Sequence, residues 1–112
     1  MIISLPPCFD EDHNLDFRYL RETIFNIASN LHAGHLVIKE SVCYPGATEE
    51  LIVPILECAN GSHLKVSRNS AGPNEFFVGT SPERTDLGSI IDQREVPRIV
   101  SGVDQFGCEL TN

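Results

Sequence analysis

The predicted fold depends on one stretch, LDFRYLRETIFNIASNLH at residues 15–32. Its apolar residues recur at steps of three and four, which gathers them into one stripe of a helix with 3.6 residues per turn. The stripe consists of Phe17, Leu20, Ile24, Ile27, Ala28 and Leu31. Asn14 is placed to cap the first turn, and Gly34 is placed to end the helix in the left-handed conformation. A helix with one apolar face needs a second layer to cover that face.

Extended segments are expected to form the second layer. Four segments are rich in β-branched and alternating apolar residues: 35–44, 50–59, 62–68 and 75–79. Asn60-Gly61 separates the second from the third, and Asn-Gly between two extended runs favours a type I′ hairpin, because both turn residues must reach positive φ. Pro54 removes a backbone donor, which places its strand at an edge or a bulge.

These features predict an α+β fold in which one N-terminal amphipathic helix packs on a mainly antiparallel β-meander. A length of 112 residues fits a single domain over residues 1–112. Shorter strands are expected at residues 1–5, 96–103 and 106–110.

The net charge of the chain limits the classes of partner that it can bind. Sixteen acidic residues against eight basic ones give a formal charge of −8, and the basic residues are scattered. Because nucleic acids and anionic membranes attract Lys and Arg, the sequence predicts neither as a partner. No apolar run reaches the roughly 20 residues of a membrane span, and the N-terminus lacks the basic region of an export signal. We therefore expect a cytoplasmic protein whose four cysteines are free thiols.

Motifs of catalysis and cofactor binding do not occur in the sequence. It contains no GxGxxG, no GxxxxGK[ST], no GxSxG and no CxxC. Cys58 and His63 flank the Asn60-Gly61 turn, but a structural zinc site needs four ligands. The sequence therefore predicts no catalytic residue, no metal site, no cofactor and no enzyme.

Two acidic groups remain as candidate partner-binding residues. They are Asp10, Glu11, Asp12 and Asp16 near the N-terminus, and Glu83, Asp86, Asp92 and Glu95 in the second half. Their carboxylates are suited to pairing with Arg and Lys of a basic protein. The alternative is a solvated loop whose charges stabilise the N-terminal end of the helix.

A short acidic chain with a helix at residues 15–32 and a meander through Asn60-Gly61 resembles the bacterial immunity proteins made against contact-dependent and polymorphic toxins. The resemblance implies an inhibitor that occludes the active site of a basic, nuclease-type toxin. Two alternatives stay open. One is a small enzyme or ligand-binding domain with dispersed polar residues on its sheet, and the other is a homo-oligomeric structural module joined through edge strands.

Overall fold

The computed structural model describes residues 1–59, 61, 64–69, 72–82 and 96–112. The elements follow one another in the order β1 (Ile2–Ile3), α1 (Arg18–Ala28), β2 (Leu36–Lys39), η1 (Thr48–Ile52), α2 (Val53–Cys58), β3 (Lys65–Val66), β4 (Glu75–Thr80), β5 (Ser101–Gly102) and α3 (Gln105–Thr111). The π-helical turn η1 leads directly into α2. Among the described residues, no helix is both long enough and apolar enough to cross a membrane.

The sheet is mainly parallel. Its strand order is β1-β2-β4-β3, and these four strands pair in parallel. The fifth strand, β5, pairs antiparallel with the carboxyl end of β4. In the central pair, Leu36 lies opposite Phe77 and Lys39 opposite Thr80. Since parallel neighbours need a crossover connection, the chain returns from β2 to β4 through η1 and α2.

The predicted antiparallel meander is therefore wrong. Most of residues 50–59, predicted as a strand, is helical. Short runs of Ile, Val and Leu do not distinguish a buried strand from a buried helix, and burial against the sheet and α1 decided the outcome. The buried residues have the spacing of one helix face: Leu56 is buried, and so are Ile52 and Leu51, which lie four and five residues before it. Pro54 lies just after the junction of η1 and α2, where the helical hydrogen-bonding pattern changes from π to α.

Two further strand predictions fail with the meander. The predicted hairpin at Asn60-Gly61 is wrong, because the segment before it is the helix α2 rather than a strand. Gly61 does have the positive φ that such a turn needs, 58°, and Asn60 lies outside the described residues. The predicted strand at 106–110 is the helix α3, because Asp104 caps its first turn by accepting a hydrogen bond from the Gly107 N–H. The strands predicted at 1–5, 62–68, 75–79 and 96–103 each contain a strand, which is short except for β4.

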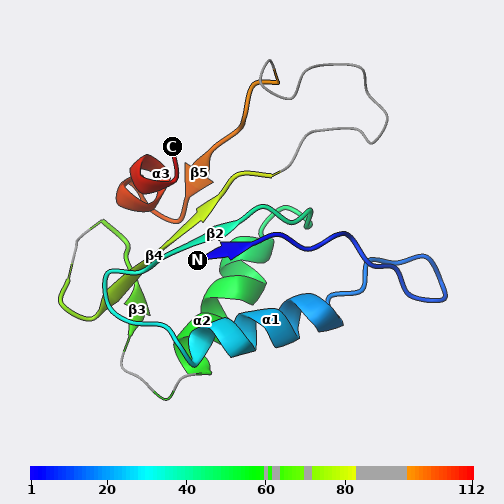
Figure 1. Cartoon of the computed structure of the whole chain (residues 1–112), viewed down its shortest axis with the longest axis horizontal. Coiled ribbons are helices and arrows are strands. Elements are labelled where there is room, and N and C mark those ends of the chain that lie inside the picture. Colours follow the sequence, from blue (N-terminus) through cyan, green and yellow to red (C-terminus); the bar gives the residue numbers. More distant parts are fainter. Residues whose placement is uncertain (60, 62–63, 70–71, 83–95) are drawn as a thin grey trace.

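The N-terminal amphipathic helix is confirmed, with narrower bounds than predicted. It spans Arg18–Ala28 and begins after Phe17 rather than Asn14. Leu20, Ile24 and Ala28 of the apolar stripe are buried. Figure 1 shows α1 and α2 side by side along one side of the strands, and both contribute to the hydrophobic core with the inward side chains of β2 and β4.

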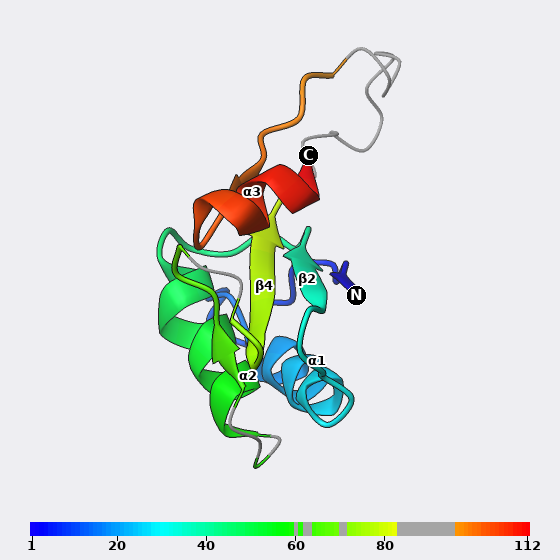
Figure 2. The ribbon, with the colours of Figure 1, turned by 90° about the vertical axis from the view of Figure 1, so that its left-hand side faces the viewer.

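The opposite face of the sheet carries α3, which lies across β4, β5 and β2 (Figure 2). Close packing requires glycine at the contacts. A Cβ on Gly79 would overlap the Thr111 side chain, and a Cβ on Gly107 would meet the Val78 carbonyl oxygen at 2.8 Å. The parallel sheet is thus covered on both faces, as parallel sheets generally are.

A buried carboxylate joins α3 to the loop after β3. Asp104 accepts hydrogen bonds from Ser67 Oγ at 2.6 Å, Gly107 N–H at 2.7 Å and Asn69 N–H at 3.1 Å. Burial by itself raises the pKa of Asp104, but the hydrogen bonds from Ser67, Gly107 and Asn69 outweigh it and hold the pKa below 3.8. The charged form of Asp104 therefore stabilises the folded state.

We expect Ile24→Ala to lower the free energy of unfolding by about 2–5 kcal/mol, because Ile24 is fully buried. The matched control is Phe25→Ala on the same helix. Phe25 is 57% exposed, so its change should stay below about 0.5 kcal/mol. Urea denaturation of both variants tests the orientation of α1, and equal losses would contradict it.

We expect Asp104→Asn to cost about 1–3 kcal/mol at neutral pH, because the amide turns donors toward groups that need an acceptor. Since the folded pKa lies below the unfolded value of about 3.8, the stabilisation is complete above that pH and is lost as pH falls further. The gap between wild type and variant in denaturation midpoints should close at low pH. A gap independent of pH would show that the charge of Asp104 has no such role.

Candidate functional site

Three parallel strands end at one edge of the sheet. The last residues of β1, β2 and β4 are Ile3, Lys39 and Thr80. In open α/β sheets, ligands bind outside the carboxyl ends of the strands. The loops that follow these three residues therefore form the candidate site.

Hydrogen bonds fix the strand ends relative to one another. Ser41 Oγ accepts from the Leu5 N–H at 2.8 Å and donates to the Ile3 carbonyl at 3.4 Å, which joins β1 to β2. The Lys39 carbonyl accepts from Thr80 Oγ1 at 3.1 Å and from the Ser81 N–H at 3.0 Å. The hydroxyl groups of Ser41 and Thr80 thus help to hold the ends of β1, β2 and β4 in place relative to one another.

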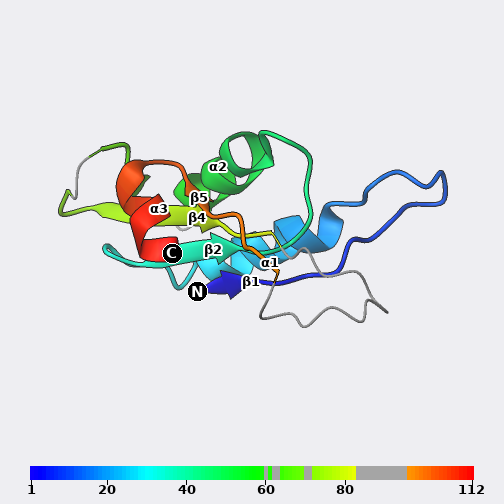
Figure 3. The ribbon, with the colours of Figure 1, turned by 90° about the horizontal axis from the view of Figure 1, so that it is seen from above.

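The first hollow at this edge, which we call the β1 cavity, lies beyond β1. It has a volume of about 570 Å³ and its lining includes Leu5, Pro6, Cys8, Tyr19 and Ser41. The segment after β1 runs outward from the sheet and turns back before it enters α1 (Figure 3). The size of the cavity is typical of small-molecule sites, and its walls are mainly apolar, with Asp16, Glu22, Thr23, Asn26 and Ser41 as polar members of the lining.

The second hollow, which we call the β4 cavity, lies beyond β2 and β4. It has a volume of about 430 Å³ and its lining includes Lys39, Cys43, Thr48, Thr80 and Gly102. Val42, which is exposed, contributes to both cavities. The site therefore consists of two hollows that meet at the loop after β2.

Cys43 is the thiol of the β4 cavity. Its partial burial raises its pKa, and the nearby Lys39 ammonium opposes this effect without cancelling it. A thiol with a raised pKa is a poor nucleophile at neutral pH. The raised pKa therefore gives no support for Cys43 as a nucleophile.

The acidic residues predicted near the N-terminus lie in or beside the loop at residues 9–15, and the side chains of two of them bond to nearby residues of the same segment. Asp10 Oδ1 accepts from the N–H groups of Asp12 at 3.0 Å and Asn14 at 2.8 Å. Asp16 forms an ion pair of 2.7 Å with Arg18, whose side-chain hydrogen bond lowers the pKa of Asp16. Glu11 and Asp12 are exposed. Of this group, Asp16 alone lines a cavity at the edge.

The second predicted group, Glu83, Asp86, Asp92 and Glu95, lies outside the described residues. The described structure does not bring the two groups together. None of the observed contacts tests whether either group binds a partner, so that assignment stays a prediction.

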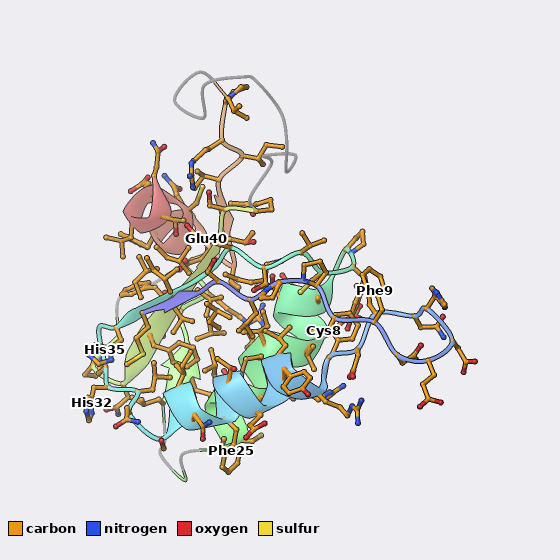
Figure 4. All side chains as sticks on the ribbon, turned by 45° about the vertical axis from the view of Figure 1, so that its right-hand side comes forward. Cys8, Phe9, Phe25, His32, His35 and Glu40 are labelled. Atoms are coloured by element: carbon orange, nitrogen blue, oxygen red, sulfur yellow. The ribbon has the colours of Figure 1, made fainter. Side chains whose placement is uncertain are left out.

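His32 and His35 lie away from the candidate site. Figure 4 shows His32 and His35 near the amino end of β2, whereas Glu40 directly follows its carboxyl end. The rings of His32 and His35 lie 5.3 Å apart, and His63 is outside the described residues. The described part of the chain holds no group of three residues placed to bind a metal ion.

Sequence reasoning missed the residues at this edge, including Lys39, Ser41 and Thr80. Each follows or ends an apolar run, which is a detectable signal. It becomes informative only when the strands are known to be parallel, because antiparallel strands would place residues 39 and 80 at opposite edges.

Comparison with known proteins identifies relatives of the whole chain. A model of the NAD-binding domain of the UDP-glucose/GDP-mannose dehydrogenase family matches residues 1–110. UDP-N-acetyl-D-glucosamine 6-dehydrogenase of Pseudomonas aeruginosa is 38% identical over 87 residues, which are 78% of this chain and 19% of that protein.

Solved structures agree with these matches. The NDP-N-acetyl-D-galactosaminuronic acid dehydrogenase of Methanosarcina mazei has a TM-score of 0.75 and 33% identity, covering 96% of this chain and 21% of that one. The GDP-mannose dehydrogenase of Pseudomonas aeruginosa has a TM-score of 0.76 over 97% of this chain and 24% of that one. At 21% identity, the second likeness shows a shared fold, which is α/β and Rossmann-like.

These findings correct the functional predictions. The resemblance to immunity proteins is wrong, and so are the inhibition of a toxin and the basic toxin partner, because the matched proteins are sugar-nucleotide dehydrogenases. The prediction that the chain has no part in an enzyme is wrong for the same reason. The chain spans about a fifth of the length of the curated relatives it matches.

We expect Cys43 to react with iodoacetamide at neutral pH at least about tenfold more slowly than Cys58, because burial raises its pKa and limits access. Cys58 is an exposed cysteine on α2 and provides the internal control. Time-resolved peptide mapping by mass spectrometry measures both rates in one sample. Equal rates in the folded protein would contradict the described environment of Cys43.

Proposed function

The chain belongs to the UDP-glucose/GDP-mannose dehydrogenase family, and on this basis we propose that it supplies one half of the NAD-binding domain of a sugar-nucleotide dehydrogenase. Dinucleotide-binding folds are built from two βαβαβ halves, each of which holds one mononucleotide. The succession β1, α1, β2, α2 and β4, with its parallel strand order, has the pattern of one such half. This pattern is the observation that carries the proposal.

The proposed half is the second one. The first half carries the glycine-rich GxGxxG turn that holds the pyrophosphate. The 112 residues contain no GxGxxG. Its absence is what supports assigning the chain to the half that holds the other mononucleotide, the one with the nicotinamide.

The edge of β1 supports the same assignment. The Met1 and Ile3 carbonyls accept bonds from β2, so Ile2 and Ser4 direct their backbone groups to the other side. Among the described residues no strand pairs with β1 on that side, and Ile2 is 63% exposed. In the strand order 3-2-1-4-5-6, the first strand of the second half lies beside the first strand of the glycine-rich half. We place that half on the open edge of β1.

The β1 cavity then lies where the strand order reverses, at the crevice in which dinucleotides bind. Its volume fits a small-molecule site, and its apolar lining suits a flat ring. NAD, when bound, supplies the hydride acceptor. The residues of this chain would orient it: Leu5, Pro6 and Tyr19 offer packing surfaces, and Ser41 keeps the floor of the cavity fixed through its bonds to β1.

A nucleotide sugar is the proposed substrate class, because the relatives are named for UDP-, GDP- and NDP-linked sugars. A cytoplasmic location belongs to the same proposal. Its support is the four free cysteines, which suit a reducing compartment. Cell fractionation with an antibody to the chain tests the location.

Saturation-transfer NMR of the 112-residue chain with NAD⁺ tests the cofactor assignment. We expect stronger transfer to the nicotinamide protons than to the adenine protons, because the glycine-rich turn is not in this chain. Nicotinamide mononucleotide should compete with NAD⁺, whereas AMP should not. The method detects weak binding, which is expected when one half of the contacts is present.

Two cysteine variants provide the matched controls. Cys8→Trp places a bulky ring in the β1 cavity and should remove most of the nicotinamide signal. Cys58→Trp adds the same ring at an exposed position on α2 and should leave the signal unchanged. Stronger transfer to adenine, or no transfer to any proton of NAD⁺, would overturn the proposal.

A further inference from the structure

Lys39 is a buried cation in the β4 cavity. It ends β2 and is 8% exposed, although lysine is almost never buried without a partner. Side chains alternate along a strand, so Lys39 lies on the same face of the sheet as the fully buried Val37. Its backbone carbonyl accepts hydrogen bonds from Thr80 and Ser81, and the residue is part of the lining of the cavity.

The Lys39 ammonium has no carboxylate partner among the described residues. The ion pairs recorded there join Arg18 to Asp16, Lys65 to Glu57 and Arg98 to Glu40. Within the described lining of the cavity, Glu49 carries the only carboxylate; it is exposed and forms no ion pair of 4.0 Å or less with Lys39. In the part of the chain that the structure describes, this cation thus has no ion pair, although the sequence carries twice as many acidic as basic residues.

A buried charge without a partner is costly, and a bound counter-ion removes much of that cost. The remaining polar groups of the cavity suit an anion with several oxygen atoms. Thr48 and Ser101 also line it, and each carries a hydroxyl group that can donate a hydrogen bond, whereas the Thr80 hydroxyl already donates to the Lys39 carbonyl. A carboxylate or phosphate would find a cation and donors in one hollow of about 430 Å³.

We propose that the β4 cavity is an oxyanion-binding subsite in which Lys39 pairs with a carboxylate or phosphate group of a small molecule. This subsite is distinct from the β1 cavity and does not depend on the proposed binding of NAD. The group could come from a nucleotide phosphate or from a sugar acid, and the two sources share the same chemistry toward Lys39.

Titration of the ¹⁵N-labelled chain tests this subsite, with inorganic phosphate in one arm and glucuronate in the other. We expect saturable amide shifts at residues that line the β4 cavity, including Cys43, Thr48 and Gly102, in at least one arm. The arm that saturates at the lower concentration identifies the source of the group. Chloride at matched ionic strength provides the control for screening.

Variants test whether anion binding depends on Lys39 itself or on the overall charge of the chain. Lys39→Met, which keeps the length of the stem, should weaken binding at least about tenfold, and Lys39→Arg should keep it. Lys65→Met removes the other lysine of the chain, which is exposed on β3 and paired with Glu57, and should have no effect. Glu49→Gln removes the carboxylate from the lining and should strengthen binding.

A second measurement uses the unaltered chain, in case Lys39→Met does not fold. Acetylation of Lys39 should slow in the presence of the anion that binds, while acetylation of Lys65 in the same sample should not change. Shifts that do not saturate in either arm, equal binding by wild type and a folded Lys39→Met, or equal effects on the two lysines would overturn the proposal. None of these results bears on transfer to nicotinamide, so the two proposals fail separately.

Discussion

The parallel pairing of β2 with β4 is the constraint on which the rest of the structure depends. Once Leu36 lies opposite Phe77 and Lys39 opposite Thr80, both strands end at the same edge. The connection between them must then cross one face of the sheet, and the buried residues of η1 and α2 fill that crossover. The same geometry places two cavities side by side along the carboxyl edge.

Coverage of both faces follows from that pairing. A parallel sheet leaves no face that tolerates water well, so α1 and α2 cover one side and α3 the other. The α3 side has little room, and Gly79 and Gly107 let the helix approach the backbone of β4. Asp104 then joins this helix to the loop after β3 through three hydrogen bonds. These contacts hold β4 and β5 in place, and both strands contribute residues to the lining of the β4 cavity. The packing of α3 therefore supports the site at the edge of the sheet.

The net charge of the molecule says less about binding than the positions of its individual charged side chains. A net charge of −8 suggested a basic protein as the partner, but Asp10 and Asp16 are occupied by bonds within their own segment. The proposed anion subsite depends instead on a single cation, Lys39, which is buried and has no ion pair among the described residues. Net charge sums exposed groups that water screens, whereas a ligand responds to the few groups held in a hollow.

The sequence by itself determined the amphipathic helix α1, the strand β4, and the exclusion of a glycine-rich phosphate loop from these 112 residues. Those features are local, since a 3.6-residue stripe or an alternating run can be read within one segment. Tertiary structure decided that residues 48–58 are helical, that the strands are mainly parallel, and that residues 39 and 80 meet. A run of Ile, Val and Leu satisfies either a buried strand or a buried helix, and only the sheet it packs against selects one. The functional edge depends on that choice, because strand direction determines which residues converge.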